Sequence, residues 1–189
     1  MTILYILIAI VVVILLWIAG SYNGFISRVN RTKEALADID VQLKRRYDLI
    51  PNLVETVKGY ASHESGVFEK VTEARTAAMQ VSSTGSLADK TQAENQLSGT
   101  LKTLFAVSEA YPDLKANQNF LDLQRELADT EDKIQAARRF YNSNVQELNT
   151  AIQQFPGNVI AGSFHISKMD LFQLSDADSA AKEPVKVSF

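Results

Sequence analysis

One stretch decides the fold: residues 21–60 read SYNGFISRVNRTKEALADIDVQLKRRYDLIPNLVETVKGY. Nine apolar residues and one threonine recur in it at steps of three or four, which places them on one face of an α-helix. Unbroken, such a helix would run to roughly 60 Å at 1.5 Å per residue. No surface helix of a small domain needs this length, so we interpret it as a stalk that continues into a bundle helix. The stripe comprises Phe25, Val29, Thr32, Leu36, Ile39, Leu43, Tyr47, Ile50, Val54 and Val57.

Pro51 lies inside this pattern. A proline there removes a backbone hydrogen bond and usually kinks or ends a helix, at a cost of about 3 kcal/mol. The apolar register nevertheless continues across it, with Ile50 before and Val54 after. We therefore expect a kinked but continuing helix, and a break into two helices is the alternative.

Before this stretch, every residue from Ile3 to Ala19 is apolar, with Tyr5 and Trp17 near the two ends. Together with the flanking Thr2 and Gly20, the run just spans a hydrocarbon core of about 30 Å, and amphipathic rings favour the membrane interface. We predict a transmembrane anchor over residues 1–20, with residues 3–19 in the lipid bilayer. A cleaved signal peptide is the rival interpretation, since small residues follow Ala19. The run is longer than the usual apolar region of a signal peptide and has no basic residue before it, which favours the anchor.

Charges beside the anchor predict its orientation. Arg28, Arg31 and Lys33 follow it closely, whereas no charged side chain precedes it. Loops rich in Lys and Arg remain in the cytoplasm. We therefore expect a single-pass protein with its N-terminus outside and its domain in the cytoplasm.

The composition favours an all-α fold, because helix-forming residues are plentiful while Gly and Pro number only 8 and 4. We expect a shorter helix from Ser62 or His63, a third from about Leu87 to Tyr111, and a fourth from about Asn117 to Gln154. Between them, residues 82–86 resemble a loop, and residues 155–158 form a strong turn signal. The fourth helix carries an apolar stripe that matches the first in period and length.

These patterns predict three regions. The anchor of residues 1–20 precedes an antiparallel four-helix-type bundle over residues 21–162, whose first and last helices are long. Residues 163–189 form a C-terminal extension that we expect to be partly mobile.

Charge and residue types narrow the function. A net charge of −3 argues against a broad nucleic-acid surface, and a chain without cysteine has no thiolate nucleophile or Cys-type zinc site. His63 and His165 are the only histidines and lack the spacing of a zinc-protease helix. We therefore expect no catalytic, metal or cofactor site. The alternative is an enzyme that uses scattered carboxylates such as Asp40 and Glu131.

The polar side of the first long helix offers a candidate partner surface. Projected at 100° per residue, Arg45, Asp48 and Asn52 fall opposite the apolar stripe, while Asp40 and Arg46 lie on its flanks. One interpretation is a solvated face with weak pairs between neighbouring turns. The other is that the flanking charges pair between helices and fix their register, while the outward set meets a partner.

Several motifs in this chain resemble the LemA family of bacterial proteins. They include IDVQLKRRYDLIPNLV at 39–54, AYPDLKAN at 110–117, ARRFYN at 137–142 and FPGN at 155–158. The resemblance implies one N-terminal transmembrane helix with its N-terminus outside, and a cytoplasmic helical domain. The family supplies no established catalytic residue.

We therefore expect a non-catalytic interaction or scaffold protein at the bacterial cytoplasmic membrane. Its expected partners are the bilayer, an unidentified membrane or cytoplasmic protein, and further copies of itself, but no nucleic acid. A second expectation from the resemblance is an accessory role in membrane protein quality control or envelope stress.

Overall fold

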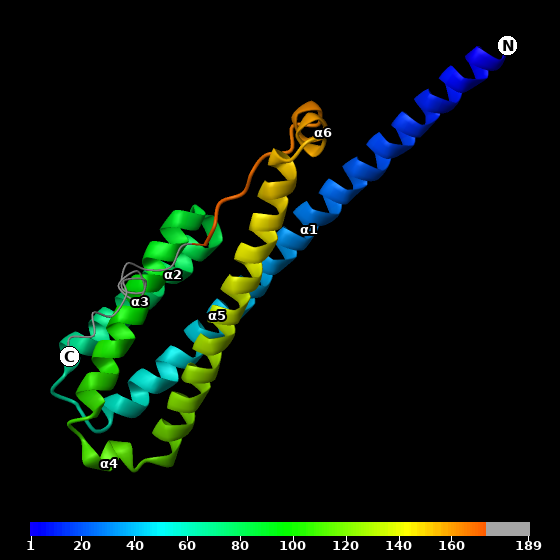
Figure 1. Ribbon diagram of the computed structural model, residues 1–189. Coiled ribbons are helices and arrows are strands. Elements are labelled where there is room, and N and C mark those ends of the chain that lie inside the picture. Colours follow the sequence, from blue (N-terminus) through cyan, green and yellow to red (C-terminus); the bar gives the residue numbers. More distant parts are fainter. Residues whose placement is uncertain (173–189) are drawn as a thin grey trace, which may run out of the picture. The chain divides into compact units, whose positions relative to one another are not determined.

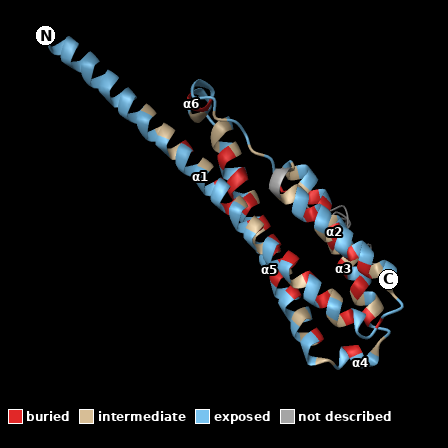
Figure 2. Cartoon of the chain, turned by 180° about the vertical axis from the view of Figure 1, so that it is seen from behind, coloured by how far each residue is buried: buried red, intermediate tan, exposed pale blue. Residues whose placement is uncertain are grey.

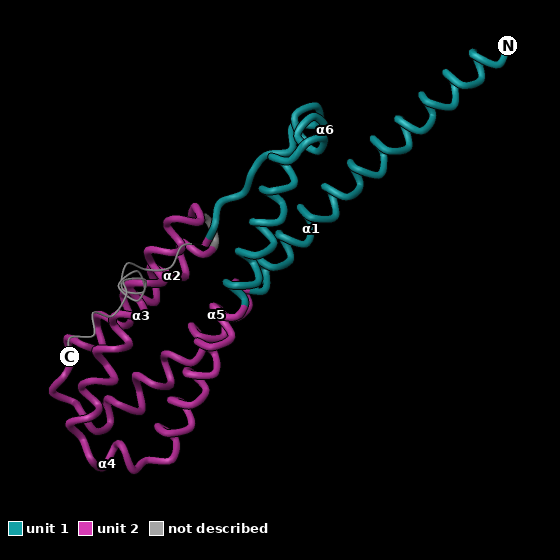
Figure 3. The backbone as a smooth tube through the Cα atoms, in the orientation of Figure 1, with its two compact units in different colours: residues 1–38, 137–171 teal, residues 39–136, 172–189 magenta. Residues whose placement is uncertain are grey.

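The computed structural model describes residues 1–172, apart from the side chains of Ser83 and Thr84. These residues form helices and their connections, without a strand, so the predicted all-α class is confirmed (Figure 1). The arrangement as an antiparallel four-helix-type bundle stays a prediction. Two compact units are distinguished: unit 1 comprises residues 1–38 and 137–171, and unit 2 comprises residues 39–136 together with Phe172 (Figure 3).

Helix α1 (Thr2–Lys58) is 57 residues long and contains Pro51. The predicted continuation through Pro51 is therefore confirmed, and the alternative of a break into two helices is wrong. Its apolar side chains as far as Trp17 are exposed (Figure 2). Within residues 1–172, α1 is also the one helix long and apolar enough to cross a membrane.

The predicted apolar stripe of α1 forms one side of the protein core. Seven of its members are buried and the other three are partly buried. The buried members are Phe25, Thr32, Ile39, Leu43, Tyr47, Ile50 and Val57.

Unit 2 contains residues 39–58 of α1, three whole helices and the first part of α5 (Gln118–Gln153). The whole helices are α2 (Ser65–Thr84), α3 (Leu87–Ser108) and α4 (Pro112–Lys115). Helix α2 extends three residues into the segment predicted as a loop. The predicted third helix corresponds to α3, which ends three residues before the expected end at Tyr111, and α4 is a short helix beyond that range that the sequence did not predict. The start of α4 has a local cause, because proline is preorganised for the first position of a helix and Pro112 begins α4.

The start of α3 is fixed by a reciprocal cap. The Ser86 hydroxyl accepts a hydrogen bond from the backbone N–H of Asp89 at 3.2 Å, and the Asp89 carboxylate accepts one from the backbone N–H of Ser86 at 3.1 Å. Hydrogen bonds from the Ser86 hydroxyl and backbone lower the pKa of Asp89. Such a capping box satisfies N–H groups that would otherwise lack partners at the start of a helix.

Unit 1 contains the rest of α1 and α5, with helix α6 (Gly157–Ser163) and the segment after it. Its core consists of Phe25, Leu148, Ile160 and Ala161. A side chain at Gly157 would approach the Ala151 carbonyl oxygen to 2.7 Å, so the turn into α6 requires glycine for close packing.

Hydrogen bonds fasten the segment after α6 to α5. The Asn149 amide donates to the Met169 carbonyl at 2.8 Å and accepts from its N–H at 3.0 Å, and the Tyr141 hydroxyl donates to the Asp170 carbonyl at 2.9 Å. Burial, with a smaller effect from the charge of Asp170, raises the pKa of Tyr141. The predicted extension of residues 163–189 is thus held to α5 near its start, and residues 173–189 lie outside the described residues.

Candidate interaction surface

The predicted partner surface lies in unit 2, on the outer side of α1. Arg45, Asp48 and Asn52 are all exposed there. Their spacing of three and four residues puts them on one helical face, which we call the α1 outer face. The structure therefore confirms that these side chains point outward, while their role remains a proposal.

Contacts of the α1 outer face within unit 2 are weak. Arg45 lies 4.0 Å from the carboxylate of Asp129, and both side chains are about half exposed. Asp129 makes a closer pair with Lys133 at 2.7 Å, and this hydrogen bond is the main cause that lowers the pKa of Asp129. Exposed pairs contribute only about 0–1 kcal/mol, so Arg45 can exchange this contact for another at little cost.

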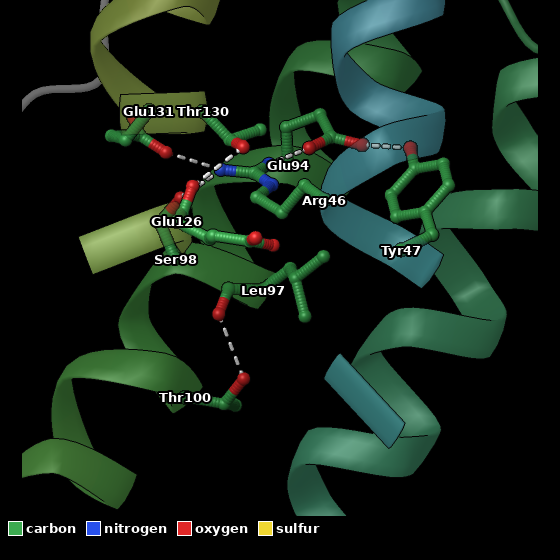
Figure 4. Close-up of polar contacts among 9 residues, drawn as sticks. All are labelled: Arg46, Tyr47, Glu94, Leu97, Ser98, Thr100, Glu126, Thr130 and Glu131. Carbon is green, nitrogen blue, oxygen red and sulfur yellow. Dashed lines mark hydrogen bonds and ion pairs between the residues drawn. The ribbon is translucent and has the colours of Figure 1, made fainter. Parts of the chain in front are cut away.

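A buried polar network lies directly beside this face (Figure 4). The Arg46 guanidinium donates hydrogen bonds to Glu94 and Ser98 of α3 and to Glu131 of α5. The Ser98 bond measures 3.1 Å and the Glu131 bond 2.7 Å. The Tyr47 hydroxyl donates to the second carboxylate oxygen of Glu94. One arginine thus joins three helices of unit 2.

Burial makes this network energetically important. The side chains of Arg46 and Glu94 are only 1% and 2% exposed, whereas that of Glu131 is 39% exposed. A buried charge is tolerated only when it is paired and hydrogen-bonded. Arg46 Nε, in addition, is buried without a hydrogen-bond partner. The sequence placed Arg46 on the flank of the stripe, and the structure places it in the core.

A second charge pair joins α1 to α3. Lys90 lies 3.3 Å from the Asp40 carboxylate. Together with the Arg46–Glu131 pair, this supports the interpretation that flanking charges pair between helices. It also means that Asp40 and Glu131, the carboxylates considered for an enzyme, are each ion-paired in the structure. No group of three or more His, Asp or Glu side chains suited to hold a metal occurs among the described residues.

A shallow hollow between α1 and α2 extends the candidate surface, and sequence reasoning missed it. Its volume is about 390 Å³, and Glu55, which lines it, follows Asn52 by one helical turn. Three of its eight lining residues are acidic and one is basic. The lining residues are Val54, Glu55, Lys58, Ser65, Phe68, Glu69, Thr72 and Glu73.

The exposed apolar span at the start of α1 and the ion-paired helices that follow define the class as a membrane-associated, all-α protein. The sequence pattern of the LemA family matches residues 35–189. The chain therefore belongs to the LemA family. The match includes the α1 outer face together with Arg46 and Glu94.

Individual proteins are also similar to this chain. Protein LemA of Metamycoplasma hominis is 28% identical over 161 residues, which cover 84% of this chain and 72% of the relative. Magnetosome protein MamQ 2 of Paramagnetospirillum magneticum is 22% identical over 175 residues, and MamQ of Magnetospirillum gryphiswaldense is 20% identical over 174 residues. Each MamQ match covers 80% of this chain and 64% of the relative, so the chain spans slightly less than two thirds of the MamQ proteins.

Proposed function

We propose that this chain is a non-catalytic, membrane-anchored interaction or scaffold protein, which binds a partner protein through the α1 outer face at the bacterial cytoplasmic membrane. The observation that carries the proposal is that one helix, α1, supplies both the apolar span and the exposed face of Arg45, Asp48 and Asn52. A partner bound there would be held by the same helix that enters the bilayer.

The buried network beside the face supports this role. Arg46 directly follows Arg45 along α1 and donates hydrogen bonds to three residues of α3 and α5, which fixes the rotation of the helix in unit 2. The outer-face side chains therefore project from a preorganised backbone. Preorganisation raises affinity because less conformational freedom is lost on binding.

Partner binding can be tested by replacing the face while preserving the fold. The triple change Arg45→Ala, Asp48→Ala and Asn52→Ala should remove specific crosslinked proteins in intact membranes, because a few residues usually dominate an interface. Unfolding free energy should change by less than about 1 kcal/mol, since the contacts are exposed. Crosslinking followed by mass spectrometry gives the partner list, in which a second copy of the chain is recognisable.

A matched control lies on α5 of the same unit. Gln118, Asp122 and Arg125 are exposed and form a similar amide, acid and arginine set, joined by hydrogen bonds of 2.9 and 3.0 Å. Replacing these three with Ala should leave the partner list intact. An unchanged list for the outer-face variant would contradict the proposal, and an unfolded variant would show that this face is buried in the native protein.

Orientation is tested separately. We propose that the domain faces the cytoplasm, because Arg28, Arg31 and Lys33 follow the span. A cysteine introduced at the exposed Ala77 of α2 should resist a membrane-impermeant thiol reagent in cells with an intact inner membrane, and react after the membrane is opened. The native chain provides a clean background because it contains no cysteine. Labelling in intact cells would place the domain on the outer side.

A further inference from the structure

Unit 1 exposes a group of large apolar side chains around α6. Phe155 is 82% exposed, Val159 57% and Phe164 47%. Val159 is the member within α6: Ile160 and Ala161 face the core, so the opposite side of this short helix is left uncovered, and Phe155 and Phe164 flank the helix. We call Phe155, Val159 and Phe164 the α6 apolar patch.

The structure fixes where this patch lies along α1. Ile18 packs against the core cluster that contains Ile160 and Ala161. Trp17 and Ser21 line the same hollow as Phe155, Pro156 and Gly157. The Tyr22 and Phe164 rings lie with their centroids 4.6 Å apart. Helix α6 and the turn before it therefore pack beside residues 17–25 of α1.

That position coincides with the membrane surface. If residues 3–19 cross the hydrocarbon core, the residues that follow them on α1 pass through the headgroup layer. This layer is about 5–8 Å thick on each side, which corresponds to four or five helical residues at about 1.5 Å each. Trp17 and Tyr22 are residue types that prefer this layer. The α6 apolar patch is thus carried at the depth where apolar side chains can enter lipid.

The charges of this end of unit 1 suit a membrane surface. Residues 1–33 and 148–169 contain no Asp or Glu. The same ranges contain Arg28, Arg31, Lys33 and Lys168, and Arg28 is exposed beside the hollow that Phe155 lines. Basic residues next to an apolar surface favour binding to the anionic lipids of a cytoplasmic leaflet.

We infer that the α6 apolar patch is a second membrane contact, in which Phe155, Val159 and Phe164 enter the interfacial layer of the bilayer beside the transmembrane span. The occupant of this patch is lipid, because the patch is continuous with the lipid-facing surface of α1 through Trp17. The contact does not depend on the partner binding proposed for the α1 outer face in unit 2. Unit 1 would then be held at the bilayer by two elements, the span of α1 and the α6 apolar patch.

The depth of α6 can be measured with spin labels on the full-length chain. Asn158→Cys and Gly162→Cys place labels on exposed positions of α6 without removing the patch, and an added Cβ at Gly162 meets no atom within 4 Å. Leu15→Cys marks the bilayer interior. The matched control is Phe140→Cys, an exposed phenylalanine of the same unit about 20 Å along α5 from its end.

After reconstitution into vesicles of zwitterionic and anionic phospholipid, collisions of each label with oxygen and with a water-soluble nickel chelate report its depth. The α6 labels should lie about 5–10 Å below the headgroup surface, between the Leu15 and Phe140 labels. Nickel accessibility equal to that at Phe140 would overturn the inference. Shielding of the α6 labels from both reagents would overturn it too, because protein, such as a second copy of the chain, would then cover the patch.

Discussion

Replacing Arg46 with methionine is expected to lower the free energy of unfolding by about 3–5 kcal/mol, because it leaves a buried carboxylate without its cation. Glu94 is the residue left unpaired, since Arg46 is the cation that contacts it. The Tyr47 hydroxyl still donates to Glu94, but a single neutral donor does not offset the loss of a charge. Denaturant unfolding of the full-length chain in detergent, followed by circular dichroism, measures the change.

A double replacement separates the charge effect from simple loss of packing. The variant with both Arg46→Met and Glu94→Leu removes the buried pair together, and such hydrophobic replacements are often close to neutral. It should recover much of the stability that Arg46→Met loses. Glu94→Gln alone should cost less than Arg46→Met, because Arg46 keeps the partly exposed Glu131 at 2.7 Å. If the double variant were less stable than Arg46→Met, the stability lost by Arg46→Met could not be attributed to an unpaired buried carboxylate at Glu94.

Truncation of the apolar stripes should have an effect of similar size. Leu43 belongs to the predicted stripe of α1, and it is buried in unit 2 together with Leu127 of α5. Cutting either to Ala should lower the free energy of unfolding by about 2–5 kcal/mol, through lost burial and the cavity that remains. This is a large share of the roughly 5–15 kcal/mol by which typical domains are stable.

The control for the stripe is a substitution on the opposite side of the same helix. Val41 is 62% exposed, so Val41→Ala should change stability by no more than about 0.5 kcal/mol. Thermal unfolding of the three variants compares them directly. Midpoints for Leu43→Ala and Leu127→Ala equal to that of Val41→Ala would mean that the stripes do not form the core.

Periodicity predicted the long helices well, because the same spacing of apolar residues recurs over many helical turns. The stripe from Phe25 to Val57 continues across Pro51 in the sequence, and α1 continues with it. Short elements were harder. The four-residue helix α4 and the seven-residue helix α6 contain too few turns to show a period, and their positions depend on packing.

The burial of Arg46 could not be read from its own helix. An arginine beside an apolar stripe usually extends its charged end into water, and only a partner from another helix makes full burial tolerable. One signal was present in α3, where Glu94 lies three residues before Leu97 and seven before Leu101, on the buried side. A charged residue inside an apolar stripe indicates a buried partner, although the sequence alone does not identify it.

The candidate surface, too, could be predicted from the sequence only in part. The outward direction of Arg45, Asp48 and Asn52 followed from helical geometry, and the structure agrees. The neighbouring hollow of α1 and α2 could not be predicted, because it depends on how two separate helices pack.

The core of unit 1 determines when this part of the protein can fold during biosynthesis. Roughly 135 residues separate Phe25 from Ile160, although both belong to one cluster. Ribosomes add about 5–20 residues per second, so Phe25 waits on the order of ten seconds for this partner to be made. During that time the start of α1 has emerged with its apolar stripe uncovered. Closure of unit 1 is therefore a late event that follows the synthesis of almost all of the described chain.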